Sequence, residues 1–141
     1  MRSRIQQSYL AGFLDADGSI YVQAKPNRTY RYGFQIAPYI VLFQSAKDRT
    51  NFENVCALIG TGYLRKRKDG ILEYIIGRSF AIKEFIKDVY PFLILKKRQA
   101  ELLLRIFKEK ERVKSKQDFE KLLILVDRFR ELNYSKKRKH R

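Results

Sequence analysis

The stretch that decides the fold of this 141-residue chain is residues 9–20, YLAGFLDADGSI. An apolar helical segment ends in two carboxylates, Asp15 and Asp17, before Gly18 breaks the helix and a strand begins. A carboxylate in the last turn of a helix lies at the negative end of the helix dipole, where it is unfavourable. The two acids therefore indicate that a cation binds at this turn.

Size and composition fit one folded domain with a core of its own, since 45% of the residues are apolar. There is no apolar run near the roughly 18 residues of a membrane span, and no charged-then-apolar secretory leader. The single cysteine, Cys56, excludes an internal disulfide framework. We therefore expect an intracellular protein, cytoplasmic or organellar, that is not secreted and has no membrane partner.

The charge balance points to a polyanionic partner. The chain has 31 Lys and Arg against 15 Asp and Glu, a net charge of +16. A domain this basic collects polyanions, and nucleic acid is the leading candidate. A solubilising surface, or a protein of the ribosomal kind, is the competing explanation of the charge alone.

The sequence predicts an α+β fold of the order αββαββα with an extra C-terminal helix. Ser3 and Gln6 form a capping box that opens the first helix, and Lys68-Asp69-Gly70 is a hairpin signal between two expected strands. The pairs of strands predict a four-stranded antiparallel sheet covered on one face by helices. The expected helices are 4–15, 46–59, 79 to before Pro91, 93–112 and 118–133, and the expected strands are 19–25, 30–43, 62–67 and 71–76. We expect one domain over 1–134 and a disordered basic tail over 135–141.

Three interpretations of the acidic turn compete. Asp15 and Asp17 could simply end the helix and hydrogen-bond a turn. A calcium loop is a second possibility, but its register would place Phe13 at the first ligand position and Ala24 at the twelfth, where a bidentate glutamate is needed. The third is a divalent-metal phosphodiesterase site.

One carboxylate per chain cannot complete the near-octahedral oxygen shell of magnesium, but two chains can. Ser8, Gly12 and Ala16 form a stripe of small residues along the first helix, and such a stripe lets another helix approach closely. If the helix packs against its copy on a two-fold axis, the Asp17 carboxylates of both subunits meet in one small volume. The DADG segment occurs once, so the chain carries one half of such a site.

The segment also resembles the signature of the LAGLIDADG homing endonucleases, which it matches at Leu10 to Gly12 and Asp15 to Gly18. The resemblance runs through about residues 5 to 133 and is close to the single-motif homodimeric subgroup. Shared features are Lys25-Pro26-Asn27, Gly60-Thr61-Gly62-Tyr63, Pro91-Phe92-Leu93 and a glutamine that ends the second strand. The resemblance implies a sequence-specific, double-strand DNA endonuclease, of the kind encoded in introns, that hydrolyses phosphodiester bonds in a long, nearly palindromic site.

The resemblance also implies roles for individual residues. Asp17, with the carbonyl of Ala16, would bind Mg²⁺, for which Mn²⁺ could substitute, whereas Ca²⁺ would bind without supporting cleavage; no small-molecule cofactor is implied. Gln44 would orient the nucleophilic water, and Lys96 would stabilise charge on the phosphate. The subgroup has a basic residue where this chain has Asp48, so the neighbouring Arg49 is our choice for the third pocket residue. The motif helices would form the dimer interface, with contact residues Ser8, Ala11, Gly12 and Asp15, and Asp15 would brace the partner helix.

The polar face of the sheet would read double-stranded DNA, because arginine fits guanine edges and glutamine or asparagine fits adenine. A strand of about ten residues spans ~33 Å, and DNA rises ~3.4 Å per base pair, so each subunit could follow about ten base pairs. The expected DNA-binding residues are Tyr21, Gln23, Lys25, Asn27, Arg28, Tyr30, Arg31, Gln35, Ala37, Tyr39, Val41, Arg65, Arg67, Lys68, Glu73 and Ile75.

Two alternative functions remain open. Some relatives assist intron splicing, so the chain could be an RNA maturase that cleaves little. It could also be a basic nucleic-acid-binding module that uses the acidic turn only for folding. Magnesium-dependent cleavage separates the endonuclease from both alternatives.

Overall fold

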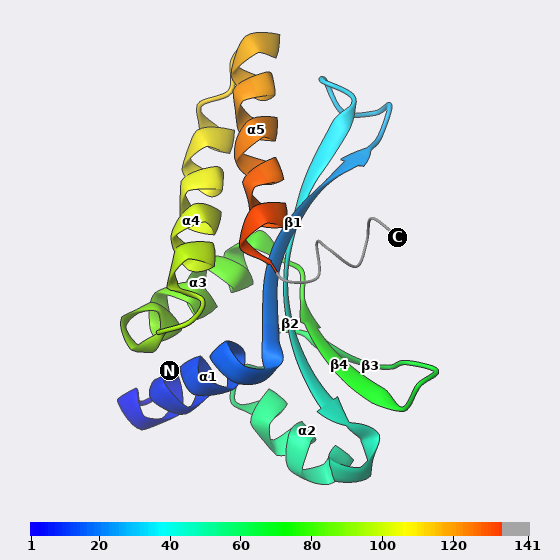
Figure 1. Cartoon of the computed structure of the whole chain (residues 1–141), viewed down its shortest axis with the longest axis vertical. Coiled ribbons are helices and arrows are strands. Elements are labelled where there is room, and N and C mark those ends of the chain that lie inside the picture. Colours follow the sequence, from blue (N-terminus) through cyan, green and yellow to red (C-terminus); the bar gives the residue numbers. More distant parts are fainter. Residues whose placement is uncertain (134–141) are drawn as a thin grey trace. The chain divides into compact units, whose positions relative to one another are not determined.

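The structure, a computed structural model, describes residues 1–133, so the predicted tail over 135–141 lies outside the described residues. The described chain forms α1 (Arg4–Asp17), β1 (Gly18–Pro26), β2 (Phe34–Ser45), η1 (Ala46–Asp48), α2 (Arg49–Ala57), β3 (Tyr63–Lys66), β4 (Ile71–Ile76), α3 (Ser79–Val89), η2 (Tyr90–Phe92), α4 (Lys97–Glu111) and α5 (Lys116–Leu132) (Figure 1). In these residues four strands form one sheet in the order β1-β2-β4-β3, with β4 antiparallel to β2 and β3. The predicted α+β class and element order are confirmed.

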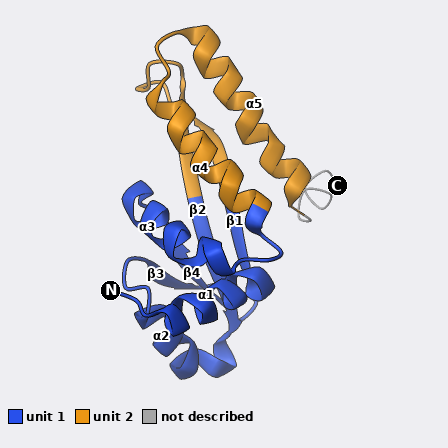
Figure 2. Ribbon diagram, turned by 90° about the vertical axis from the view of Figure 1, so that its left-hand side faces the viewer, with its two compact units in different colours: residues 1–20, 39–97 blue, residues 21–38, 98–141 orange. Residues whose placement is uncertain are grey.

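Within the described chain the residues divide into two compact units (Figure 2). Unit 1 comprises residues 1–20 and 39–97, and unit 2 comprises residues 21–38 together with the chain from residue 98 onward. Strands β1 and β2 each contribute residues to both units. The single domain over 1–134 stays a prediction.

Helix α1 shows why the decisive stretch folds as it does. The Ser3 hydroxyl accepts from the Gln6 N–H and the Gln6 side chain accepts from the Ser3 N–H, which completes the predicted capping box. Leu10, Ala11 and Leu14 are fully buried, and they anchor α1 in the core of unit 1 because their spacing places them on one side of the helix. Ala11, which we expected in a dimer interface, therefore packs inside its own protomer.

Strand β2 begins at Phe34 rather than at residue 30. Residues 27–33 form a loop that is closed by a hydrogen bond from the Asn27 N–H to the Gly33 carbonyl, at 2.8 Å. Gly33 has a φ of +82°, in the left-handed region that glycine adopts without strain. Tyr30 and Arg31 consequently lie on the loop and not on a strand.

The predicted helix over 46–59 begins as the 3₁₀ turn η1, which Ser45 caps by accepting from the Lys47 N–H. Its α-helical part, α2, ends at Ala57, and Gly60 follows with a φ of +79°. The strands on either side of residues 67–70 form the predicted hairpin β3–β4.

The predicted helix over 93–112 begins only at Lys97. Ahead of it, the N–H groups of Ile94 and Lys96 both donate to the side chain of Asp15. Because these two donors have a carboxylate partner far away in the sequence, residues 93–96 stay outside the helix.

Unit 2 is held together by its own apolar core. Phe119 on α5 stacks on Tyr32 and Phe34, with ring centroids 5.1 and 6.3 Å apart. Leu103 and Ile106 of α4 and Leu122 and Phe129 of α5 are buried. The hairpin of β1 and β2 is thereby fixed against α5 inside this unit.

None of the helices within residues 1–133 combines the length and the apolar character that crossing a membrane would require.

Candidate functional site

The carboxylate of Asp17 stands at the C-terminal end of α1, in unit 1. Its side chain is exposed, and within residues 1–133 it forms no hydrogen bond or ion pair. Ala16 precedes it in the same last turn, where helix carbonyls lack intrahelical donors. The turn therefore offers a carboxylate and a carbonyl, both hard oxygen donors of the kind that Mg²⁺ binds.

Lys96 approaches the same helix end from the loop that precedes α4. Its ammonium Nζ donates to the backbone carbonyl of Asp15 at 2.7 Å, and its N–H donates to Asp15 Oδ1 at 3.0 Å. Lys96 is a predicted site residue that lies 79 positions after Asp17 in the sequence. The structure brings it to the end of α1.

The charge on Lys96 is set by opposing effects. Partial burial lowers the pKa of the Lys96 ammonium from its ordinary value, and the negative charges of Asp15 and Asp17 act against that shift. Because Lys96 Nζ donates to the carbonyl of Asp15, two residues before Asp17, the ammonium and the exposed carboxylate lie at the same helix end. A cation and an anion so arranged can act together on a phosphate.

Gln44 lies near the end of β2, opposite Leu72 of β4. Its Oε1 accepts from the Ser45 N–H at 2.8 Å, which leaves the amide nitrogen of Gln44 as the group available to a water or phosphate. Within residues 1–133, Gln44 forms no hydrogen bond with Asp17.

Arg49 begins α2, and its Nε donates to Glu53 Oε2 at 3.3 Å, one turn along the same helix. Both side chains of this pair are about half exposed, so the pair is weak and the guanidinium can exchange partners. In the described residues no hydrogen bond or ion pair joins Arg49 to Asp17. Arg49 as the third pocket residue stays a prediction.

Asp15 has partners inside its own protomer. Its two carboxylate oxygens accept from the Ile94 N–H at 2.8 Å and from the Lys96 N–H at 3.0 Å. Each oxygen of this carboxylate therefore has a backbone donor within the protomer, and its expected role in bracing a partner helix stays a prediction. The sequence gives no local signal for these contacts, since the donors lie 79 and 81 residues away.

The described residues contain no cluster of three or more His, Cys, Asp and Glu side chains that could hold a metal ion. A cation at Asp17 consequently needs further oxygen ligands from water, from a phosphate or from a second chain. The donor set of one protomer fits half of a shared magnesium site.

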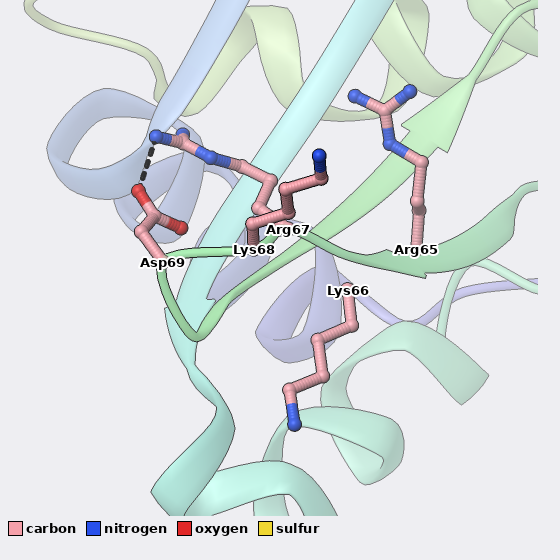
Figure 3. A pocket seen from close by; sticks show the side chains of 5 residues that line it. All are labelled: Arg65, Lys66, Arg67, Lys68 and Asp69. Atoms are coloured by element: carbon pink, nitrogen blue, oxygen red, sulfur yellow. Dashed lines mark hydrogen bonds and ion pairs between the residues drawn. The ribbon is translucent and has the colours of Figure 1, made fainter.

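The hairpin β3–β4 presents a basic surface on unit 1. Arg65 and Glu73 face each other across the two strands, and both Nε and Nη2 of Arg65 donate to Glu73 Oε1. At the turn, Arg67 Nη2 donates to Asp69 Oδ2 at 2.6 Å. Figure 3 shows the five residues that line an open pocket here, Arg65 to Asp69, with the side chains of Arg65 and Lys66 pointing in opposite directions from the strand.

Asp69 is a residue that the sequence analysis missed, although it lies in the Lys-Asp-Gly turn that predicted the hairpin. It accepts from the Ile71 N–H as well as from Arg67, and so supports the turn and gives the exposed Arg67 guanidinium a partner beside it. An acid two residues after an arginine in a tight turn is the signal that could have identified it.

Unit 2 carries the predicted DNA-binding residues of the first strand pair. Gln23 and Lys25 are exposed on β1, whereas Ile20 and Val22 are buried, so the predicted alternation of this strand is confirmed. Asn27 lies at the start of the loop, where its Oδ1 accepts from both the N–H and the hydroxyl of Thr29.

Three of the residues expected to contact DNA are buried in the protomer: Ala37, Val41 and Ile75. Burial does not alternate along these parts of the strands, since residues 36–38 and 40–42 of β2 and residues 74–76 of β4 are all buried. The assignment of these three residues as DNA contacts stays a prediction.

Comparison with known proteins identifies the family. The model of the LAGLIDADG endonuclease family matches residues 10–100. The chain is 36% identical over 132 residues to DNA endonuclease I-CreI of Chlamydomonas reinhardtii, covering 93% of this chain and 80% of that protein. It is 30% identical over 135 residues to DNA endonuclease I-CvuI of Chlorella vulgaris, covering 96% of this chain and 84% of that protein.

The fold agrees with a solved structure of the same kind. The crystal structure of I-CvuI, in complex with the I-CreI target in the presence of magnesium, aligns with a TM-score of 0.84 at 28% identity, over 93% of this chain and 83% of that one. Together with the acidic turn at the end of α1, these likenesses establish that the chain belongs to the LAGLIDADG endonuclease family.

Proposed function

We propose that this chain is a homing endonuclease that hydrolyses both strands of a long, nearly palindromic DNA site, as a homodimer with a divalent cation. The single observation that carries the proposal is the exposed carboxylate of Asp17 at the same helix end as the Lys96 ammonium. The net charge of +16 supplies the attraction for DNA. The family and the names of the two curated relatives agree with this function.

The free side of α1 supports a homodimer. Ser8, Gly12 and Ala16 are exposed, and a Cβ added at Gly12 would meet no atom within 4 Å. Ile5 and Tyr9 are large apolar side chains that are also exposed on this helix. A second copy of α1 would cover them, and a closed two-fold dimer is the commonest way to do so.

The residues that would hold the cation are Asp17, through its carboxylate, and Ala16, through its carbonyl. With one such pair from each protomer, waters and phosphate oxygens would complete the shell. When bound, Mg²⁺ supplies neutralisation of charge at the phosphate and activation of water. We expect Mn²⁺ to substitute for it and Ca²⁺ to bind without supporting cleavage.

The chain's own side chains would do the remaining work. Gln44 would hold the attacking water through its amide nitrogen, and Lys96 would donate to the phosphate as negative charge develops. Arg49 would leave Glu53 to bind a phosphate oxygen. Arg65 and Arg67, held by Glu73 and Asp69, would read base edges in the major groove.

A selection from a randomised DNA library tests this function. The wild-type chain is incubated with the library and Mg²⁺, and the cut molecules are sequenced. We expect double-strand cuts within sites of two-fold symmetry, and no cuts when EDTA replaces the metal. A chain that cuts nothing and binds RNA more tightly than DNA at fixed salt would favour a maturase; equal binding of both without cutting would favour a basic binding module.

A further inference from the structure

The loop of residues 93–96 is fastened to the end of α1 by one residue. Asp15 accepts from the Ile94 N–H at 2.8 Å and from the Lys96 N–H at 3.0 Å through its carboxylate. Its backbone carbonyl accepts from Lys96 Nζ at 2.7 Å. Asp15 thus holds Lys96 at the main-chain nitrogen and at the tip of the side chain; we refer to these contacts as the Asp15 clamp.

Apolar packing anchors this loop at Leu93 but contributes little to the position of the residues that follow. Leu93 is buried, but the next two side chains, Ile94 and Leu95, are 81% and 72% exposed. The segment between Leu93 and α4 therefore depends on hydrogen bonds to stay where it is. Charge-assisted bonds from two backbone N–H groups to one carboxylate are strong and directional.

The clamp matters for chemistry because lysine is a long, flexible side chain with a large rotamer entropy. A lysine that must meet a phosphate next to Asp17 works best when it is already held there, because positioning before reaction lowers the entropy lost on reaching the transition state. Asp15 and Asp17 lie two residues apart on one rigid helix end, so a lysine fixed to Asp15 is also fixed relative to Asp17.

We propose that Asp15 is a positioning residue that sets Lys96 beside Asp17 for phosphodiester cleavage. This inference rests on the proposed endonuclease function and deepens it. It assigns to the first acid of the Asp-Ala-Asp segment a task inside its own protomer, separate from cation binding by Asp17.

A double-mutant cycle tests the positioning role. Asp15→Asn, Lys96→Met and the double variant are compared with the wild-type dimer in single-turnover cleavage of a site recovered from the library. We expect Asp15→Asn to lower the rate of cleavage about 10- to 100-fold, the usual effect of losing a supporting contact, with the DNA dissociation constant changed less than twofold. The double variant should be no slower than Lys96→Met alone, because Asp15 then has nothing to position.

Further variants distinguish a loss of positioning from a general loss of stability. Asp88→Asn removes an ion pair with Arg2 in unit 1, at 2.8 Å, and serves as a matched control that lowers the thermal midpoint without lowering the single-turnover rate. Ile94→Pro deletes one donor of the clamp and leaves both charged residues in place, and Ile94→Ala is its reference because it keeps the N–H. We expect Ile94→Pro to cut more slowly than Ile94→Ala at equal DNA affinity.

The outcomes separate the two proposals. Rate losses of Asp15→Asn and Lys96→Met that multiply in the double variant, or an Ile94→Pro rate equal to that of Ile94→Ala, would overturn the positioning role while leaving the endonuclease function standing. A wild-type chain that cuts no site in Mg²⁺ would overturn the endonuclease function, and the positioning role with it.

Discussion

Asp17 occupies an electrostatically poor position, since a negative charge in the last turn of α1 faces the negative end of the helix dipole. Within residues 1–133 it gains no hydrogen bond or ion pair in return. Asp15, two residues earlier, accepts from backbone donors and is stabilised by them. The two aspartates at one helix end therefore differ in their surroundings: Asp15 is held by backbone donors, and Asp17 is left exposed for an external ligand.

The variant Asp17→Asn should abolish cleavage while the protein stays folded. The amide keeps the size of the side chain but removes the negative charge that binds a cation. Without that charge, the repulsion between residue 17 and the negative end of the α1 dipole disappears, so the thermal midpoint should stay equal or rise slightly. Gel-shift affinity for a selected site, in Ca²⁺, should stay within a fewfold of wild type. Asp127→Asn, at an exposed position of α5, is the control and should cut normally; a variant Asp17→Asn that still cuts would contradict the assignment.

Cys56 should be unreactive in the native protein. It is buried in α2, and burial together with the charge of Glu53 raises the pKa of its thiol to about 11. At pH 8 the native thiol should react with iodoacetamide far more slowly than in urea, as mass spectrometry can measure. Because the folded pKa is raised above the thiol's ordinary value of 9.0, the stabilisation from this thiol is complete below about pH 9 and is lost as the pH rises towards 11. Equal labelling rates with and without urea would show that Cys56 is accessible.

At the scale of elements, α1 has two different sides. One side buries Leu10 and Leu14 in unit 1, and the other exposes Ser8, Gly12 and Ala16. The fold of the protomer itself does not require a glycine on the exposed side, because a Cβ at Gly12 would meet nothing within 4 Å. A glycine in the middle of a helix costs about 1 kcal/mol relative to alanine, and the proposed packing of a second α1 against it would explain its presence.

Replacing Gly12 with leucine should therefore break the dimer and leave the protomer folded. We expect the sedimentation mass to fall from that of two chains to that of one, with an unchanged helical signal in circular dichroism. Glu84→Leu adds the same side chain at an exposed position of α3 and should leave the mass unchanged. A Gly12→Leu protein that sediments as a dimer would exclude α1 as the interface.

Local signals predicted some elements well and others poorly. The capping box of Ser3 and Gln6 located the start of α1, and the Lys-Asp-Gly turn located the hairpin β3–β4. The start of α4 was wrong because the donors of Ile94 and Lys96 bind Asp15, a partner 79 and 81 residues away that no local pattern can indicate. The start of β2 was wrong because the loop closed by Asn27 and Gly33 competes with the strand.

At the scale of the whole molecule, the net charge of +16 governs how the protein meets DNA. Contacts with phosphates release counterions, so affinity falls steeply with salt, by a slope of about −0.9 per phosphate contact. Contacts with base edges add sequence preference but little salt dependence.

Two substitutions in unit 2 should separate these contributions. Lys114 is exposed on the segment before α5, where we expect it to contact a phosphate. Lys114→Gln should therefore weaken binding to all sites alike and reduce the salt slope by about one. Gln23→Ala, at an exposed position of β1, should relax the sequence preference and leave the slope unchanged. Fluorescence anisotropy across a range of salt concentrations measures both effects, and a changed slope for Gln23→Ala would contradict its role in reading bases.

Some features of the candidate site could be predicted from the sequence and others could not. The order of helices and strands, the acidic turn and Lys96 beside it followed from the motif and the resemblance. The burial of Ala37, Val41 and Ile75 did not, because alternation along a strand gives the face of a residue but not how far its neighbours cover it. The sequence also did not predict the Asp15 clamp, since its hydrogen bonds form only after α1 and the loop before α4 have come together.

The sharing of a cation between two protomers is tested most directly by mixed dimers. Wild-type and Asp17→Asn chains that carry different affinity tags are co-expressed, and the dimer with one chain of each kind is purified through both tags. If the Asp17 carboxylates of both chains hold the cation together, this mixed dimer should bind its site normally and cut neither strand at a measurable fraction of the wild-type rate in Mg²⁺. A mixed dimer that cuts one strand at the wild-type rate would show that each protomer holds its cation alone.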